Sequence, residues 1–249
     1  MKVKLRRTTG TLLFALAAVV LVAALATLGA IWFSYHQGQQ KYAELAEYAD
    51  AGSGAESEIV VDWDALRAIN PDVVAWLLIP GTNVNYPIVK GADNEYYLSH
   101  DFGGEAGWLA QYGAVFMDWR NNPDWSDESY FMYGHHMIDG SMFAGIADMA
   151  DQARFDACRT ILLASPDGNF RLRSYSLVHC SDDDPIVETG FASGDAMTAY
   201  IQDKIERSVV DVGEIPAASE ITKSFAFATC DNVSTGRYVL YAYVEEKMN

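Results

Sequence analysis

No charged residue occurs between residues 11 and 33, where the chain reads TLLFALAAVVLVAALATLGAIWF. A membrane-spanning helix needs roughly 20 apolar residues, so this segment is long enough to cross a bilayer. The segment follows a short tip with four basic residues, and a basic flank of this kind favours a cytoplasmic N-terminus. A cleaved signal peptide is the alternative, but the apolar run is too long and no convincing small-residue cleavage pattern closes it. We therefore expect a cytoplasmic tip at 1–10 and a single-pass signal anchor at 11–33, with the rest of the chain outside the cell.

The 249-residue chain has room for one sizeable domain beyond this anchor, and half of its residues are apolar. Residues 36–50 predict a helix that continues outward, and the small residues AGSGAES at 51–57 predict a flexible joint. We therefore expect an extracellular helix and linker at 34–58, followed by a single folded domain at 59–249.

The extracellular part is strongly acidic. The formal net charge of the chain is −17, and without the four basic residues of the tip there remain 13 Lys and Arg against 34 Asp and Glu, or −21. Binding to nucleic acid requires a cationic face, so this composition argues against a nucleic-acid partner. Solubility is the simplest interpretation of the excess negative charge.

Short apolar runs separated by turn residues dominate the domain and predict about eight β-strands. One helix is expected near the start, where Trp63, Leu66 and Ile69 share a face, and another at 194–210 in a connection between two strands. No repeat of 20 to 50 residues is visible. The predicted fold class is mostly β: a closed, mostly antiparallel eight-stranded barrel with N-terminal helices and a helix before the strand that carries the last cysteine.

Two aromatic, apolar strands end near side chains that can perform covalent chemistry. YFMYGHHM at 130–137 presents His135, while SFAFATC ends at Cys230 and is followed by a strand that begins near Arg237. A cysteine reacts as its thiolate, which a nearby imidazole can generate, and a guanidinium can hold the oxyanion that develops on attack. The pattern predicts a catalytic set of Cys230 as nucleophile, His135 as acid and base, and Arg237 at the oxyanion.

These residues also have simpler interpretations. A cysteine at a strand end is often buried and inert, but the polar Asp231-Asn232 step after Cys230 favours exposure. His135 and His136 are neighbours, which point to opposite sides of a strand, so only one of them can face the thiol. A zinc site is disfavoured, because neighbouring histidines cannot easily share one metal and no third ligand stands at a suitable spacing.

The three cysteines, Cys158, Cys180 and Cys230, are an odd number, so at least one is not in an intramolecular disulfide. A bridge between Cys158 and Cys180 would leave Cys230 free. Buried free thiols are an equally ordinary state for the first two.

The order YGHHM, DGSMF, a strand ending in ATC and a strand beginning with GR resembles the sortase family, most closely its class B branch. The similarity covers roughly residues 60 to 245. Sortases are membrane-anchored cysteine transpeptidases that join surface proteins to the cell wall of Gram-positive bacteria. The resemblance therefore implies a sortase-type barrel and extracellular transpeptidase activity. It selects His135, the histidine directly after glycine, and implies neither a metal nor an organic cofactor.

The resemblance further implies a groove for the sorting peptide. The matching positions, each of which can equally belong to the core, are Asn94, Leu98, Tyr133, Tyr200 and Ile201. One departure is Ala228, because class B sequences carry a serine two residues before the cysteine. If that hydroxyl assists the oxyanion in the family, backbone N–H groups must do so here.

The expected partners are a surface protein or pilin with a C-terminal sorting motif and an amine acceptor, either a cell-wall precursor or a pilin lysine. An exported papain-like cysteine hydrolase is one alternative, but its cysteine comes early and its histidine late, opposite to this sequence. A membrane-anchored binding module without activity is another, against which the intact His, Cys and Arg argue.

Overall fold

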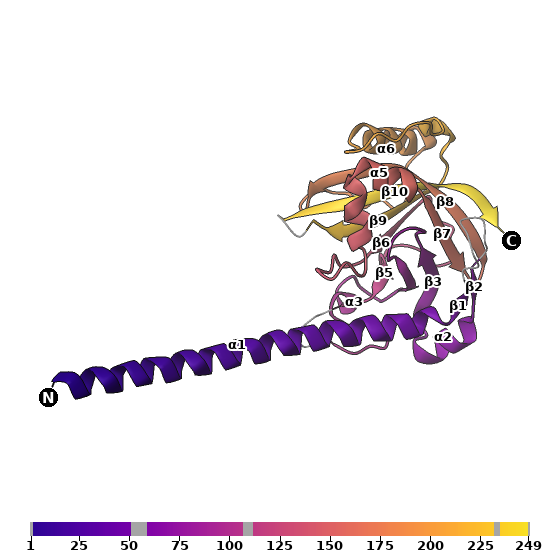
Figure 1. The fold of residues 1–249 in the computed structure, drawn as a ribbon. Helices are drawn as coiled ribbons and strands as arrows, with labels where there is room; N and C mark the ends of the chain where they lie inside the picture. Colours follow the sequence, from indigo (N-terminus) through magenta and orange to yellow (C-terminus); the bar gives the residue numbers. More distant parts are fainter. Residues whose placement is uncertain (1, 51–58, 107–111, 232–234, 249) are drawn as a thin grey trace.

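The computed structural model describes residues 2–50, 59–106, 112–231 and 235–248 (Figure 1). Eight strands form a closed barrel in the order β10-β8-β7-β3-β4-β5-β6-β9. All neighbouring pairs are antiparallel except β4–β5 and β6–β9, which are parallel. The predicted closed, eight-stranded, mostly antiparallel barrel is therefore confirmed. Its strands are β3 (Val73–Leu78), β4 (Asn85–Val89), β5 (Val115–Met117), β6 (Ser129–Tyr133), β7 (Thr160–Ser165), β8 (Gly168–Ser181), β9 (Ser224–Cys230) and β10 (Gly236–Met248).

Helices connect and cover these strands. The amphipathic helix α2 begins where predicted, because Asp62 accepts a hydrogen bond from the Ala65 N–H at 3.0 Å and so caps it. The helix predicted before the cysteine-bearing strand is α6, which covers one side of the barrel (Figure 1). The helices are α2 (Trp63–Ile69), α3 (Tyr96–Ser99), α4 (Ala144–Ala147), α5 (Gln152–Ala157) and α6 (Gly194–Glu206), with 3₁₀ turns at Asp148–Ala150 and Ala218–Glu220.

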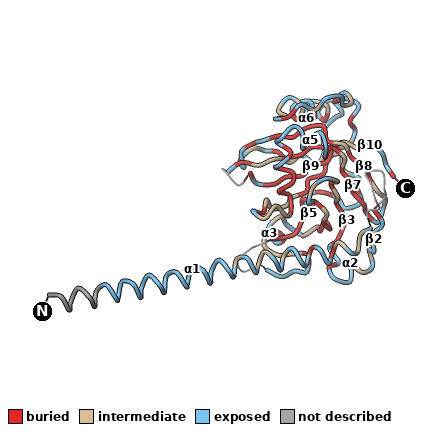
Figure 2. Tube along the Cα trace, in the orientation of Figure 1, coloured by how far each residue is buried: buried red, intermediate tan, exposed pale blue. Residues whose placement is uncertain are grey.

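Most strands bury side chains on both faces, and red predominates in the barrel in Figure 2. The long strands β8 and β10 also contain half-buried and exposed residues. In β9, Phe225 and Phe227 point into the main core, whereas Ala226 and Ala228 point outward into a second cluster beneath α6. Because side chains alternate along a strand, Cys230 lies on the same outward face as Ala226 and Ala228. It is exposed, unlike those two alanines. The nucleophile position therefore lies on the outer surface of the barrel, at the end of β9.

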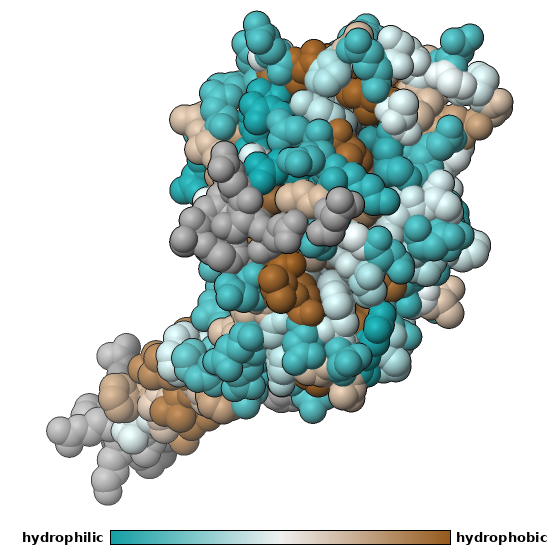
Figure 3. All heavy atoms as spheres, turned by 90° about the vertical axis from the view of Figure 1, so that its right-hand side faces the viewer, coloured by the Kyte–Doolittle hydropathy of each residue, from teal (hydrophilic) through white to brown (hydrophobic). Residues whose placement is uncertain are grey.

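The N-terminal helix α1 (Lys2–Ala46) is one continuous element. Its segment Gly10–Ala46 is long and apolar enough to cross a membrane. The part of this helix that extends away from the barrel has a largely apolar surface (Figure 3). The expected helix over 36–50 is wrong at its end, because Ala49–Asp50 instead forms strand β1 and pairs with β2 (Val60–Val61). The linker expected at 51–57 lies outside the described residues.

The last turns of α1 belong to the domain core. Tyr42 and Leu45 are buried in it, and the Tyr42 hydroxyl donates a hydrogen bond to the Gly113 carbonyl at 2.5 Å. Gln39 also donates to Asp139 at 3.0 Å. The apolar helix is therefore fixed to the barrel by side chains.

Candidate active site

Cys230 and Arg237 face each other across two antiparallel strands. They are direct partners in the register of β9 and β10, and the neighbouring Asp231 N–H donates to the Gly236 carbonyl at 3.0 Å. That bond identifies the Cys230–Arg237 position as a non-hydrogen-bonded pair, in which Cα atoms approach to about 4.5 Å and side chains share one face. Cys230 and Arg237 therefore project their side chains from neighbouring positions on one face of the sheet.

His135 reaches the same face from β6, which pairs with β9 in parallel, with Tyr133 opposite Ala228. The Gly134 N–H still donates to the Ala228 carbonyl at 3.2 Å, but β6 itself ends at Tyr133. His135 Nε2 lies 2.7 Å from the Leu98 carbonyl oxygen. A carbonyl only accepts, so Nε2 carries a hydrogen, and the neutral ring keeps its lone pair on Nδ1.

Gly113 supports the His135 ring from behind. Its φ is +56°, and a Cβ there would lie 2.6 Å from the Tyr97 carbonyl oxygen and 3.0 Å from His135 Cδ2. Only glycine fits this backbone conformation at such close approach. Because Tyr42 donates to the Gly113 carbonyl, the docked end of α1 contacts the segment that supports the histidine.

One pocket of about 280 Å³ contains all three predicted catalytic residues. Asn94, Leu98 and Tyr133, three of the five predicted groove residues, line it as well. The full lining is Asn94, Leu98, Phe116, Tyr133, Gly134, His135, Ala228, Thr229, Cys230 and Arg237. Phe116 and Thr229 were not predicted, because a buried strand residue carries no sequence signal that separates a pocket wall from the core. The Thr229 hydroxyl is buried and has no hydrogen-bond partner among the described residues.

Tyr200 and Ile201 are not brought to this pocket. Ile201 is fully buried in the cluster between α6 and the barrel. The Tyr200 ring packs against Phe191 and Tyr241 in the same region, and its hydroxyl donates to the Ile186 carbonyl at 3.4 Å. Both residues hold α6 on the barrel, so the structure does not support their expected place in the peptide groove.

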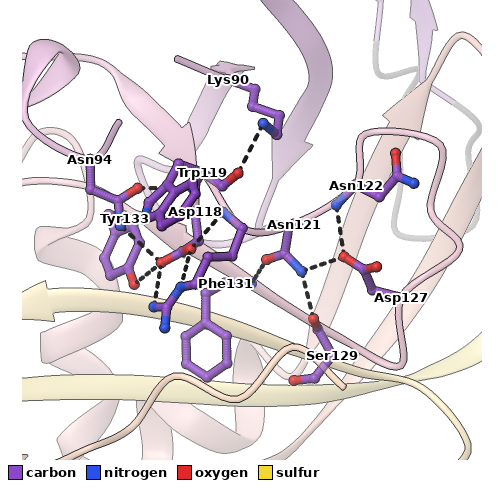
Figure 4. Close-up of polar contacts among 11 residues, drawn as sticks. Lys90, Asn94, Asp118, Trp119, Asn121, Asn122, Asp127, Ser129, Phe131 and Tyr133 are labelled. Atoms are coloured by element: carbon purple, nitrogen blue, oxygen red, sulfur yellow. Dashed lines mark hydrogen bonds and ion pairs between the residues drawn. The ribbon is translucent and has the colours of Figure 1, made fainter. Parts of the chain in front are cut away.

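A buried carboxylate, Asp118, fixes the pocket wall (Figure 4). Arg120 binds it with two N–H groups, Nε to Oδ1 at 2.9 Å and Nη2 to Oδ2 at 3.1 Å. The Tyr133 hydroxyl and the Asn94 amide also donate to Oδ2, at 2.8 and 2.9 Å. The Arg120 main-chain N–H also donates to Oδ1, at 3.0 Å. Five donor groups from three chain segments thus converge on one side chain that has no exposed surface.

The same network occupies the polar ends of Asn94. Its Nδ2 donates to Asp118, and its Oδ1 accepts from the Trp119 N–H at 3.0 Å. Asn94 was predicted to contact the sorting peptide. Asn94 lines the pocket, but in this structure its amide binds the protein itself, and its contact with a peptide stays a prediction.

We expect Asp118→Asn to lower the free energy of unfolding by about 2 kcal/mol at pH 7, since charge-assisted hydrogen bonds are lost. Burial alone raises the pKa of Asp118, but donation from Arg120, Tyr133 and Asn94 outweighs it and leaves the pKa below its usual value. A lowered folded-state pKa stabilises the protein above the unfolded pKa, near 4, and this contribution disappears as the pH falls through the folded pKa. The difference between wild type and variant should therefore shrink below about pH 4.

Urea unfolding of both proteins at several pH values measures this difference. Asp167→Asn, on the exposed β7–β8 turn, is the matched control and should have little effect at any pH. A constant difference between wild type and Asp118→Asn from pH 7 to pH 3 would show that the carboxylate charge is not what stabilises the wall.

The other two cysteines differ from Cys230 in exposure. All three are free, Cys158 and Cys180 are buried, and Cys230 is exposed. Burial raises the pKa of the Cys158 and Cys180 thiols, so both remain protonated at neutral pH. The bridge considered between them is absent, and Cys230 is the exposed thiol of the chain.

Metal chemistry and the papain-like alternative gain no support. Among the described residues, no group of three His, Cys, Asp or Glu side chains could hold a metal ion. Cys230 ends a β-strand of a barrel and follows His135 in the chain, opposite to the order of the papain-like alternative considered above.

Comparison with known proteins yields consistent matches, although no protein-family model matches the chain. The chain is 29% identical over 193 residues to Sortase B of Listeria monocytogenes, an alignment that covers 76% of each protein. It is 27% identical over 178 residues to Sortase B of Staphylococcus aureus, covering 72% of this chain and 69% of that protein. The crystal structure of sortase B from B. anthracis superposes with a TM-score of 0.73 and 27% identity, covering 86% of this chain and 98% of the other.

Proposed function

Because this chain is a class B sortase, and therefore a cysteine transpeptidase, we propose that it cleaves a C-terminal sorting motif of a surface protein or pilin and transfers the acyl group to an amine. The observation that carries the proposal is the shared pocket of Cys230, His135 and Arg237. The acceptor in this proposal is an amine of a cell-wall precursor or a pilin lysine.

In the first half-reaction, Nδ1 of His135 takes the proton of the Cys230 thiol, and the resulting thiolate attacks the carbonyl carbon of the motif's threonine. Arg237, directly across the strand pair, stabilises the oxyanion. No side-chain hydroxyl is present at Ala228, so backbone N–H groups supply the remaining support. The C–N bond then breaks, and His135 gives a proton to the leaving amine. The products are a thioester on Cys230 and a free C-terminal fragment.

In the second half-reaction, the acceptor amine attacks the thioester carbonyl. His135 removes a proton from that amine, the C–S bond breaks, and a new amide leaves with the thiolate restored. The Leu98 carbonyl holds Nε2 of His135, so Nδ1 is the nitrogen that exchanges protons in both steps. Amine must compete successfully with water, because hydrolysis of the thioester would make the enzyme a protease.

The apolar helix α1 is the proposed membrane anchor, with the N-terminus in the cytoplasm and the barrel outside. Its docking onto the barrel through Tyr42 and Leu45 supports a fixed placement of the active site close to the membrane surface. Both a membrane-bound acceptor precursor and a substrate that keeps its own membrane segment would be within reach there.

The test is an assay that distinguishes transfer of the acyl group to an amine from hydrolysis of the peptide. A library of threonine-containing peptides is incubated with the detergent-solubilised protein and a primary amine such as triglycine, and products are identified by mass spectrometry. The proposal predicts peptides that end in a new amide to the added amine. Release of carboxylic acids alone, at every amine concentration, would contradict transpeptidation and leave a hydrolase.

A further inference from the structure

We propose that His136, the second of the adjacent histidines, is a positioning residue that holds the main chain of Cys230 in place. Its Nδ1 lies 2.8 Å from the Cys230 carbonyl oxygen. This inference rests on the proposed role of Cys230 as nucleophile. It goes beyond that role because it assigns a separate task to a residue outside the predicted catalytic set.

The end of the strand explains why a side chain is needed here. Cys230 and Arg237 form a non-hydrogen-bonded pair, so the Cys230 carbonyl points away from β10 and toward the β6 side. β6 ends at Tyr133, and the last parallel ladder bond found there runs from the Gly134 N–H to the Ala228 carbonyl. One ladder step further along β9, the imidazole of His136 bonds the carbonyl of Cys230.

The turn after β6 brings the ring into position. His136 forms an isolated antiparallel bridge with Met142, and the Phe143 N–H donates to the His135 carbonyl at 2.8 Å. The backbone of both histidines is therefore fixed by the 142–143 segment. From this base, the two rings reach different partners, His135 the Leu98 carbonyl and His136 the Cys230 carbonyl.

The two contacts require opposite tautomers of the neutral rings. A carbonyl oxygen only accepts, so His136 carries its hydrogen on Nδ1 and His135 carries its hydrogen on Nε2. His136 is thus a permanent donor in its neutral and its charged form, and it does not need to exchange protons during the reaction. This separates its task from that of His135.

Losing the His136 contact releases the final peptide unit of β9. Cys230 is the last residue of the strand, and a shift of its main chain moves the sulfur relative to Arg237 and the substrate carbonyl. Catalysis is sensitive to such displacements, because a misplacement of about 1 Å can cost on the order of a hundredfold in rate. The contact is a single hydrogen bond, so we expect a smaller loss of about five- to tenfold.

The test compares three substitutions. Asparagine places an amide N–H close to the position of the imidazole Nδ1–H, glutamine extends its amide beyond that position, and alanine removes the donor. We expect His136→Ala and His136→Gln to lower kcat about five- to tenfold with little change in KM, and His136→Asn to stay within about twofold of wild type. Kinetics use the peptide that the wild type cleaves fastest, and thermal unfolding of each variant in detergent records its stability.

A spectroscopic readout tests the contact without substrate. Long-range ¹H–¹⁵N correlation spectra of the full-length protein should show the neutral ring of His136 in the Nδ1–H tautomer. Alkylation of Cys230 by iodoacetamide should change in His136→Ala more than in His136→Asn. A dominant Nε2–H tautomer overturns the inference. Wild-type kcat in His136→Gln overturns it as well, and so does an asparagine variant as slow as the alanine variant.

Cys230→Ala is measured in parallel to separate the two claims. If Cys230→Ala keeps transfer activity, the proposed function itself fails. If Cys230→Ala is inactive while all three His136 variants behave like wild type, only the role of His136 is lost.

Discussion

Cys230→Ala is expected to abolish both release of the C-terminal fragment and transfer to the amine, with kcat/KM reduced by more than about a thousandfold. The reason is that no other thiol can replace it. Cys158 and Cys180 are buried, and burial raises the pKa of both thiols, which disfavours the reactive thiolate. Initial rates with the library-selected peptide, measured with and without amine, provide the comparison.

Cys158→Ala and Cys180→Ala are the matched controls for this loss. Each removes a buried sulfur and costs about 1 kcal/mol of stability, so both should remain active at 25 °C. Cys180 is the more stringent control, because Arg237 on β10 lies between the two cysteines. Its strand partner is Cys180 on β8 and Cys230 on β9. An active Cys230→Ala variant, or an inactive Cys180→Ala variant that is fully folded, would point to a different nucleophile.

Arg237→Ala is expected to lower kcat by about a hundred- to a thousandfold, the usual cost of removing an oxyanion donor. Arg237 is half-buried and lies opposite Cys230 at a non-hydrogen-bonded position. In the proposed reaction its guanidinium stabilises the tetrahedral oxygen. KM should change much less, because the interaction strengthens when charge forms on the oxygen. Stopped assays over a range of peptide concentrations separate the two constants.

Arg237→Lys tests whether charge alone is sufficient. Lysine keeps the positive charge but lacks the planar fork of donors, so we expect only partial recovery. Alkylation of Cys230 in each variant shows whether the thiol remains accessible. A normal kcat in Arg237→Ala, or a loss confined to KM, would mean that Arg237 binds substrate without acting on the transition state.

The sequence was sufficient to predict the barrel. Short apolar runs separated by turn residues predicted about eight strands, and the barrel contains eight. Cys230 and Arg237 were also predictable as a pair, because a short connection between two strands places their ends together. The end of α1 was not, because pairing between β1 and β2 is a tertiary effect that local helix propensity does not contain.

Groove residues were harder to predict. Helical spacing identifies Ile201 as a residue that faces the barrel, but it cannot say whether that side of the helix meets substrate or core, and here it meets the core. The Asp118 network was missed because Asn94 and Tyr133 come from segments distant from Asp118 and Arg120. The only signal of this network in the sequence was the position of Asp118, a carboxylate directly after the buried strand β5.

The two histidines show a different limit. The prediction that neighbours point to opposite sides assumed that both lie on a strand. β6 ends at Tyr133, so the rule of alternation no longer applies at His135 and His136. Both rings therefore bond backbone carbonyls of residues that line the pocket, and only the structure assigns them to separate partners.

The most direct measurement is intact-protein mass spectrometry of the enzyme incubated with its best peptide in the absence of amine, followed by peptide mapping. We expect a mass increase equal to the acyl half of the peptide, located on Cys230, released by added amine and absent in Cys230→Ala. Cleavage of the peptide without an adduct under conditions that preserve thioesters, or an adduct on any other residue, would contradict acyl transfer through Cys230.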